Sequence, residues 1–309
     1  MKPMRSVPWV VAGMIAMASV TAPAAFAAKD HRAKATYKKR GAPAKAVVVK
    51  RKAAPESDGR LLIQSAAAVV ADPGSGQVLY AKNPDAVVPI ASITKLMTAM
   101  VVLDAAQRLD EPLAITPDDV DALRGSGSRL AVGTALPRED MLRLALMSSE
   151  NRAAHALARN YPGGTGAFVE AMNRKAAELG LNDTRFSDPT GLSAQNVSSA
   201  RDLVTMVAAA SGYPLVREFS TTGEYRVALN GRAREFRNTN SLVRSPNWEI
   251  SVSKTGFINE AGKCLVMQAW LADRPMIIVL LDSWGRLTRI GDANRIKRWI
   301  ETAGRIDLR

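Results

Sequence analysis

The chain has 309 residues and a formal net charge of +13, but residues 29–52 carry +9 of that charge and residues 53–309 carry only +2. Because the part long enough to fold is nearly neutral, we expect no nucleic-acid partner. The only cysteine, Cys264, excludes an intramolecular disulfide and is expected to be a buried structural thiol, and with only two histidines we expect no metal and no cofactor.

The first 27 residues have the features of a secretory signal peptide. Lys2 and Arg5 supply positive charge, Val7–Val20 is mostly apolar, and an A-x-A cleavage pattern ends at Ala27. We expect cleavage after Ala27, with an uncleaved membrane anchor as the alternative. The mature protein is then expected in the periplasm, as a monomer that is soluble or peripherally associated with the membrane.

Residues 28–60 are a basic segment without apolar periodicity, and we expect this tail to be disordered. One interpretation is a solvated linker. The other is loose attraction to anionic envelope surfaces, such as cell-wall polymer or lipid headgroups. The sequence leaves both open.

From Leu61 onward the chain is long enough for one large domain, which we expect over residues 61–305. Ser65–Ala71 and Gln77–Ala81 are apolar runs of strand length, and the turn residues between them predict a hairpin. Ser92–Gln107 is apolar nearly all round, which predicts a buried helix with Ser92 at its start.

The middle of the chain has helical apolar spacing, and strand-like runs return after Ser220 before a final helix. The expected helices are Pro137–Met147, Asn151–Asn160, a segment from Phe168 to Leu179 that Gly180 ends, Ser199–Ala210 with Ser198 or Ser199 as its cap, and Asp292–Thr302. The expected strands are Tyr225–Leu229, Trp248–Lys254, Cys264–Leu271 and Pro275–Leu281. This order predicts an α+β fold: an antiparallel sheet flanked by helices, with a mostly helical insertion at about residues 108–215.

Three short motifs occur in order on these elements: S-x-x-K at Ser92–Lys95, S-x-N at Ser149–Asn151 and K-T-G at Lys254–Gly256. Each is weak alone, since Ser251–Lys254 and Ser245–Asn247 match the first two patterns by coincidence. The first of these coincidences lies in a predicted strand, where residues three apart point to opposite faces. The order and placement of the three motifs together carry the prediction.

Ser92 and Lys95 share one helix face, because residues three apart lie side by side on a helix. At a helix start the backbone N–H groups are free, so a serine there can attack a carbonyl while its own N–H holds the oxyanion. Lys95 can act as the base only when neutral, which costs a free lysine about 4–5 kcal/mol at pH 7. Burial and a nearby cation such as Lys254 lower that cost. The alternative is an N-cap serine with an exposed lysine one turn later.

Ser149 can relay a proton to the leaving amine, and the Asn151 amide can hold a substrate carbonyl or the Lys95 amine. The alternative for this pair is a polar cap between two helices. His155 is interpreted as a partly buried helix residue, because no acid or cysteine partner is visible for it in the sequence.

Lys254 and Thr255 are placed at the end of a strand, where a cation and a hydroxyl can hold a carboxylate or carbonyl of an extended peptide. Gly256 leaves room for the backbone to approach, and the N–H of Phe257 is the natural second oxyanion donor beside that of Ser92. An ordinary turn at a strand end is the alternative.

With these motifs in place, the chain resembles the low-molecular-mass penicillin-binding proteins, the serine D-alanyl-D-alanine peptidases, over about Leu61–Thr302. The similar blocks are Pro89–Ala99, Leu146–Ala154, Asp188–Leu192 and Lys254–Phe257. The chain is most similar to the D-alanyl-D-alanine endopeptidase branch, which cleaves crosslinks between peptidoglycan stem peptides.

The resemblance implies a β-lactamase/transpeptidase-like fold and an acyl-enzyme that water resolves, without a metal. It implies that peptidoglycan stem peptides are the substrate and that β-lactams bind as inhibitors. It also implies roles for the motif residues: Ser92 as the acylated nucleophile, Lys95 as the base, Ser149 and Asn151 as relay and positioning groups, and Lys254 with Thr255 as substrate-binding groups.

Three other functions stay open at this point. A carboxypeptidase is the first, although such relatives usually carry a further C-terminal domain and membrane anchor, and only 55 residues follow Lys254 here. A β-lactamase is the second, although Glu150 inside the S-x-N motif does not resemble the separate deacylation base of those enzymes. A non-catalytic envelope-binding protein that depends on its basic tail is the third.

Overall fold

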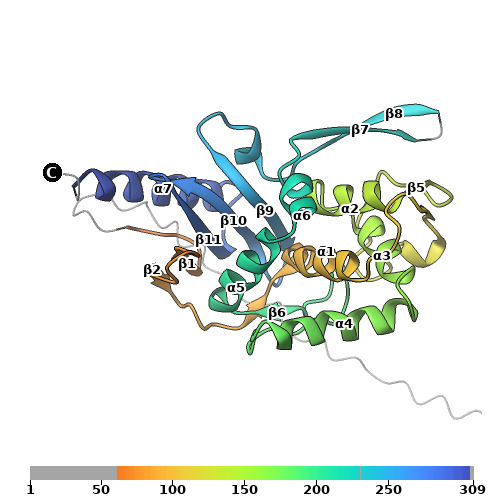
Figure 1. Ribbon diagram of the computed structural model, residues 1–309, viewed down its shortest axis with the longest axis horizontal. Helices are drawn as coiled ribbons and strands as arrows, with labels where there is room; N and C mark the ends of the chain where they lie inside the picture. The colour runs from red at the N-terminus through yellow and green to blue at the C-terminus, as the bar shows by residue number, and fades with distance from the viewer. Residues whose placement is uncertain (1–60, 230, 307–309) are drawn as a thin grey trace, which may run out of the picture. The chain divides into compact units, whose positions relative to one another are not determined.

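The computed structural model describes residues 61–229 and 231–306, the side chains of 303–306 excepted. The predicted signal peptide and basic tail lie outside these residues. The described part is built on a five-stranded sheet of order β2-β1-β11-β10-β9, in which every neighbouring pair is antiparallel (Figure 1). Its strands are β1 (Ala67–Ala71), β2 (Val78–Lys82), β9 (Glu249–Ile258), β10 (Gly262–Leu271) and β11 (Arg274–Ser283).

Both faces of this sheet are largely buried along β1, β10 and β11, which explains why these three strands are apolar in sequence without alternation. Along β1, Val69 faces one hydrophobic core while Val70 faces the other, and along β11 Val279 and Leu280 divide in the same way. The first core contains the helices of the middle of the chain. The second is covered by the C-terminal helix α7 (Thr288–Ile306), whose Ile296 is fully buried against the sheet.

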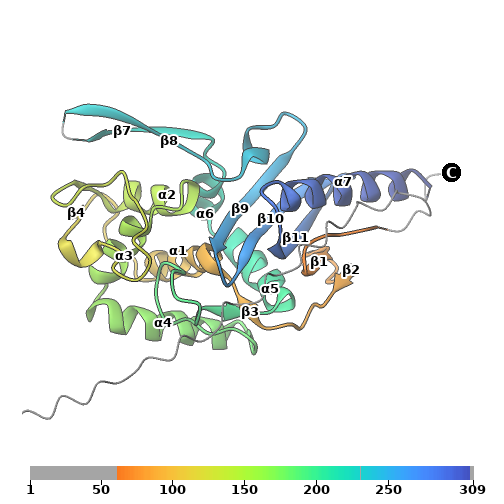
Figure 2. The same ribbon diagram turned by 180° about the vertical axis from the view of Figure 1, so that it is seen from behind.

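The helices on the first face surround α1 (Lys95–Asp104), of which the first eight residues are buried, as its apolar sequence predicts. The surrounding helices are α2 (Arg138–Met147), α3 (Asn151–Arg159), α4 (Gly164–Glu178), α5 (Ala200–Ser211) and α6 (Pro214–Ser220). Seen from behind, α2, α3 and α4 lie to one side of the sheet, and α5 lies next to β11 and β1 (Figure 2). The α+β class is confirmed, whereas the extent of the helical insertion stays a prediction.

The remaining elements are short pairs and turns. They are β3 (Val88–Pro89) with β6 (Val197–Ser198), β4 (Pro112–Ala114) with β5 (Ala135–Pro137), the hairpin of β7 (Glu224–Leu229) and β8 (Arg232–Arg237), and the 3₁₀ turns η1 (Ala91–Thr94), η2 (Pro117–Asp119) and η3 (Ser241–Arg244). Within the described residues, no helix has both the length and the apolar character needed to cross a membrane.

Three sequence predictions need correction. Ser92 does not begin an α-helix but lies in η1, and α1 starts at Lys95. Strand β9 continues to Ile258, so Lys254 and Thr255 lie inside a strand and not at its end, because β10 pairs with β9 over this whole stretch. The last helix begins at Thr288, four residues before the predicted start.

Candidate active site

Ser92 lies in a tight turn that two other segments approach closely. Ala91, just before it, has a φ of +48°, a left-handed conformation that costs a non-glycine residue energy. A Cβ atom on Gly191 would lie 2.0 Å from the Ala91 carbonyl oxygen, and one on Gly256 would lie 3.2 Å from the Ser92 nitrogen. Glycine at these two positions therefore lets the loop after Asp188 and strand β9 close on the turn that holds Ser92.

Substitution of Gly191 tests this close packing. We expect Gly191→Ala to destabilise the protein by at least about 3 kcal/mol, because overpacking adds to the cost of a left-handed alanine. We also expect the variant to slow acylation of Ser92. Gly180 is the matched control: its φ is +70°, but a Cβ there meets nothing within 4 Å. Gly180→Ala should therefore cost only about 1–2 kcal/mol. Urea unfolding of both variants gives the comparison, and equal losses would contradict the role of close packing.

Lys95 is the centre of the hydrogen-bond network. Its Nζ lies 2.9 Å from Ser92 Oγ, 2.7 Å from Asn151 Oδ1 and 2.6 Å from the carbonyl oxygen of Thr190. The side chain is only 1% exposed, and this burial lowers the pKa of Lys95 to about 7, although the charges of Asp188 and Glu150 oppose the shift. A substantial fraction of Lys95 is therefore neutral at neutral pH.

The S-x-N motif joins α2 to α3 and faces Lys95 from the other side. Ser149 has a φ of +61°, and Asn151 is the first residue of α3. The Asn151 amide is oriented at both ends, because its Oδ1 accepts from Lys95 while its Nδ2 donates to Ser126 Oγ at 3.0 Å. This arrangement leaves little rotational freedom to the amide.

The K-T-G motif completes the arrangement from β9. Lys254 Nζ donates to Ser149 Oγ at 3.0 Å and to the Thr255 carbonyl oxygen at 2.9 Å. Burial lowers the pKa of Lys254 well below its ordinary value, and the neighbouring charges of Lys95 and Arg289 lower it further. Thr255 Oγ1 donates to Thr239 Oγ1 at 2.6 Å. The structure thus brings all three motifs into one site.

Phe257 and Arg289 border the K-T-G strand. Phe257 follows Gly256 with its ring 55% exposed and the Lys263 Nζ 4.0 Å from the ring centroid. Arg289, at the start of α7, donates to the Gly256 carbonyl oxygen at 3.1 Å. The guanidinium that contacts the K-T-G strand therefore comes from α7, which follows β9 by about thirty residues in the chain.

Sequence reasoning assigned no role to four residues that complete the network. The Thr190 carbonyl, Ser126, Thr239 and Arg289 each contact a motif residue. Asp188 shapes the loop that carries Thr190 by accepting from the backbone N–H groups of Thr190, Gly191 and Ser193. The run Asp188–Leu192 was the available signal, since its D-P-T-G turn chemistry is visible in the sequence.

His155 is a partly buried residue of helix α3, as predicted, but it does have an acid partner, which the sequence did not reveal. His155 Nδ1 lies 2.9 Å from Asp119 Oδ1, and Arg159 donates to the same carboxylate. Burial works to raise the pKa of Asp119, but the hydrogen bonds from His155, Arg159 and the Thr116 N–H outweigh it and hold the pKa at about 2. Asp119 lies 36 positions before His155, so local spacing did not indicate the pair.

This carboxylate gives a pH-dependent stability. Because its folded pKa lies below the unfolded value, its contribution is present above about pH 4 and is lost as pH falls toward 2. We expect Asp119→Asn to lower the free energy of unfolding by roughly 2 kcal/mol at pH 7 and to flatten its fall between pH 4 and 2. Urea unfolding at several pH values measures this, with the exposed neighbour Asp118→Asn as control. An unchanged acid slope in Asp119→Asn would contradict the assignment.

Two further ionisable groups near the motifs, those of Glu150 and Cys264, are buried. Glu150 is buried and accepts from Ser128 Oγ at 2.6 Å and from Arg129 Nε at 3.2 Å. Cys264 is fully buried as predicted, and burial raises the pKa of its thiol to about 11, which makes it unreactive.

A cavity of about 200 Å³ opens beside the motifs. Asn151 and Thr190, which both contact Lys95, form part of its lining, together with Asp121, His155 and Leu192. The Lys95 network is therefore next to a space that a ligand can enter.

Comparisons with known proteins identify the family of the chain. The family model described as D-alanyl-D-alanine carboxypeptidase matches residues 50–284. The chain belongs to this family. The D-alanyl-D-alanine endopeptidase of Pseudomonas aeruginosa is 53% identical over 242 residues, and that of Escherichia coli is 49% identical over 242 residues, each match covering 78% of both chains.

The fold comparison gives the same result. The crystal structure of a Streptomyces DD-transpeptidase aligns with a TM-score of 0.72 at 29% identity, covering 77% of this chain and 97% of that one. The resemblance inferred from the motifs is thus confirmed, and this member of the D-alanyl-D-alanine carboxypeptidase family is a serine-type peptidase.

Proposed function

We propose that this chain is a D-alanyl-D-alanine endopeptidase that cleaves peptidoglycan crosslinks through an acyl-enzyme on Ser92. The observation that carries the proposal is the position of Lys95 Nζ, 2.9 Å from Ser92 Oγ and 2.7 Å from Asn151 Oδ1. The choice of crosslinks as substrate is supported by the Pseudomonas and Escherichia relatives, which bear the name of this activity.

The partners of Lys95 suit a neutral amine, which has two hydrogens and one lone pair. The Asn151 and Thr190 oxygens can only accept, so they take the two hydrogens, and the lone pair is left for the Ser92 hydroxyl. In the proposed acylation, Ser92 Oγ attacks the D-alanine carbonyl carbon, its proton moves to Lys95, and the carbonyl electron pair moves onto oxygen. We assign the N–H groups of Ser92 and Phe257 as the donors to that oxyanion.

Collapse of the tetrahedral intermediate breaks the C–N bond and needs a proton for the leaving amine. We assign this transfer to the Lys95 ammonium with Ser149 as relay, since the Ser149 hydroxyl is held by Lys254 Nζ at 3.0 Å. Water then adds to the ester, its proton passes to Lys95, and Ser92 leaves with a proton. Glu150 is engaged by Ser128 and Arg129, so we assign it no part in deacylation.

Strand β9 supports an extended peptide as the substrate. It is the last strand in the order of the sheet, so its outer edge is available for pairing with a peptide backbone. We propose that Lys254 and Thr255 orient such a peptide, and that β-lactams bind because they present the same acyl group to Ser92. Peptidoglycan places the enzyme outside the cytoplasm, in accord with the signal peptide expected from the sequence.

Digestion of purified crosslinked peptidoglycan, with mass analysis of the fragments, tests the proposal. Endopeptidase activity converts crosslinked dimers to monomers without releasing free D-alanine. Release of D-alanine from monomeric pentapeptides, with dimers left intact, would favour the carboxypeptidase that the family description names. Rapid turnover of penicillin without a lasting adduct would overturn both in favour of a β-lactamase.

A further inference from the structure

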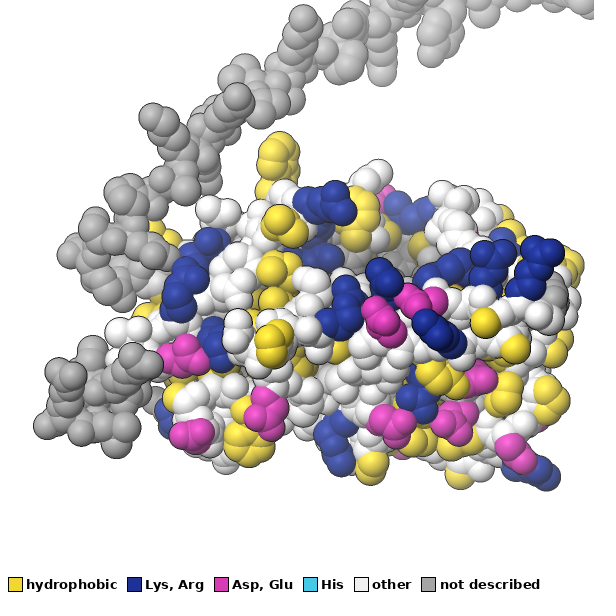
Figure 3. Space-filling model, turned by 90° about the horizontal axis from the view of Figure 1, so that it is seen from above, with side chains coloured by type: hydrophobic (Ala, Val, Ile, Leu, Met, Phe, Trp, Pro, Cys, Tyr) yellow, Lys and Arg dark blue, Asp and Glu magenta, His cyan; other side chains and the backbone are white. Residues whose placement is uncertain are grey.

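The hairpin of β7 and β8 projects from the body of the described residues and is rich in arginine. It carries four arginines and two glutamates. Figure 3 looks down on this face and shows a row of Lys and Arg side chains where the hairpin lies. The two glutamates are occupied, because Glu235 pairs with Arg226 and Arg237, and Glu224 pairs with Arg237. Among the described residues, neither Arg232 nor Arg234 has an ion-pair partner.

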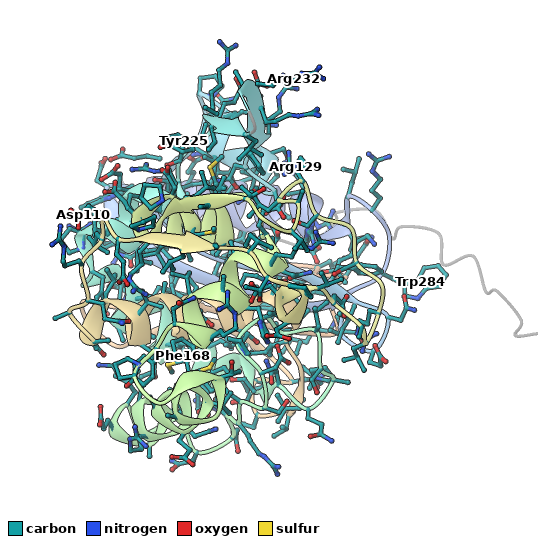
Figure 4. All side chains as sticks on the ribbon, turned by 90° about the vertical axis from the view of Figure 1, so that its right-hand side faces the viewer. Asp110, Arg129, Phe168, Tyr225, Arg232 and Trp284 are labelled. Atoms are coloured by element: carbon teal, nitrogen blue, oxygen red, sulfur yellow. The ribbon has the colours of Figure 1, made fainter. Side chains whose placement is uncertain are left out.

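The strand register places these two arginines on one face of the hairpin. Leu229 is opposite Arg232 and Val227 is opposite Arg234, and directly opposite residues share a face. Phe236 is two positions from Arg234 on that same face, and the Arg129 guanidinium lies 4.1 Å above its ring. Arg232 begins β8 just after the turn, and Arg129 lies at Phe236, near the end of β8; both are marked in Figure 4. Exposed positive charge therefore follows the hairpin from foot to tip.

The foot of the hairpin is joined to the candidate active site. Arg129 donates to Glu150, the middle residue of the S-x-N motif. The chain leaves β8 through Asn238 to Thr239, whose hydroxyl contacts Thr255 of the K-T-G motif at 2.6 Å. A polymer that binds along the hairpin is thereby held next to the residues that bind the scissile peptide.

We propose that the β7–β8 hairpin is a docking surface for the anionic peptidoglycan polymer beyond the scissile crosslink. The proposal rests on the proposed function. Stem peptides carry free carboxylates, and guanidinium groups bind carboxylates in a bidentate manner. Six residues of strand span about 20 Å, so a short peptide in the site does not reach the tip, whereas a polymer strand does. The hairpin thus distinguishes polymeric from small substrates.

Other occupants fit less well. The basic tail and a second copy of this hairpin have the same sign of charge and are repelled. A membrane surface calls for exposed aromatic or long aliphatic side chains beside the cations. The large apolar side chains of the described hairpin residues are covered, since Val227 and Leu229 are each 6% exposed and Phe236 is fully buried.

The test compares two double variants of the full chain with equal loss of charge. Arg232→Ala with Arg234→Ala removes the unpaired arginines. The control is Arg174→Ala with Arg185→Ala. Arg174 lies in α4 and Arg185 follows α4 in the chain; in Figure 1, α4 lies on the opposite side from the hairpin. We expect the hairpin variant to bind insoluble peptidoglycan about fivefold more weakly at low salt, with the difference shrinking at high salt, and the control to be unchanged. The tail is present in both, so its contribution cancels.

Acylation by a fluorescent penicillin is measured on the same proteins, and we expect equal rates for wild type and both variants. If the wild-type protein is not acylated, the proposed function is overturned, but the docking surface is not. Equal peptidoglycan binding by the hairpin variant and the control would overturn the docking surface. So would a defect that affects only binding to phosphatidylglycerol vesicles, which would assign the hairpin to a lipid surface instead.

Discussion

Ser92→Ala is expected to abolish covalent labelling by a fluorescent penicillin and to lower crosslink cleavage by about 10⁴-fold or more, because it removes the hydroxyl that lies beside the Lys95 amine. The fold should be retained, since the Lys95 amine keeps its contacts with Asn151 and Thr190. Gel fluorescence measures the labelling, and muropeptide analysis by mass measures the cleavage.

The matched control is Ser251→Ala, in the coincidental S-x-x-K pattern of β9. Among the described residues, its hydroxyl has a hydrogen bond only to the Gln268 carbonyl oxygen, at 3.3 Å. Labelling should therefore continue at the wild-type rate. Undiminished labelling of Ser92→Ala would disprove the assignment of the nucleophile, whatever the result for Ser251→Ala.

Replacement of Lys95 by arginine should lower the acylation rate by about 10³-fold, within the range of roughly 10²–10⁴ that general base catalysis contributes. Arginine keeps the positive charge but is never neutral at accessible pH, so it provides no lone pair for the Ser92 proton. The wild-type rate should rise as pH increases through about 7, because Lys95 loses its proton there. At pH 6 it should be about tenfold below the plateau reached above pH 8.

Stopped-flow acylation from pH 5 to 9 measures this profile. Lys297→Ala, which removes a lysine on α7 paired with Glu301, is the control and should leave the profile unchanged. A wild-type rate that is flat across neutral pH, or a Lys95→Arg variant that keeps the wild-type rate and profile, would show that Lys95 is not the base.

Much of the fold was predictable from short-range patterns. The strands that became β1, β10 and β11 are largely apolar runs, and α1 is apolar on all sides because it is buried in the core. Strand β8 was missed because Arg232–Arg237 has little apolar content, and its conformation depends on pairing with β7 and on Phe236 beneath Arg129. Helix α6 was missed because it has only seven residues.

Some contacts of the candidate site were likewise predictable from the sequence, and others were not. Ser92 and Lys95 were predictable as a pair, since three residues of helical backbone bring them together. The Thr190 contact was not predictable, because the acceptor is a backbone carbonyl and any residue type supplies one. Thr239 and Arg289 were not predictable either, because their partners Thr255 and Gly256 belong to other elements of the chain.

The sequence by itself determined which chemical groups are available, in what order, and which of them share a helix turn, because residue type and local spacing follow directly from the chain. It also determined the family, since the motifs and their surroundings are recognisable without coordinates. Only the tertiary structure decided that the Asn151 amide meets the Lys95 amine beside Ser92, that Lys254 meets Ser149, and that Lys95 is buried enough to lose its proton near neutral pH. All three depend on contacts between segments remote in sequence, and the free energy of a buried charge is set by everything packed around it.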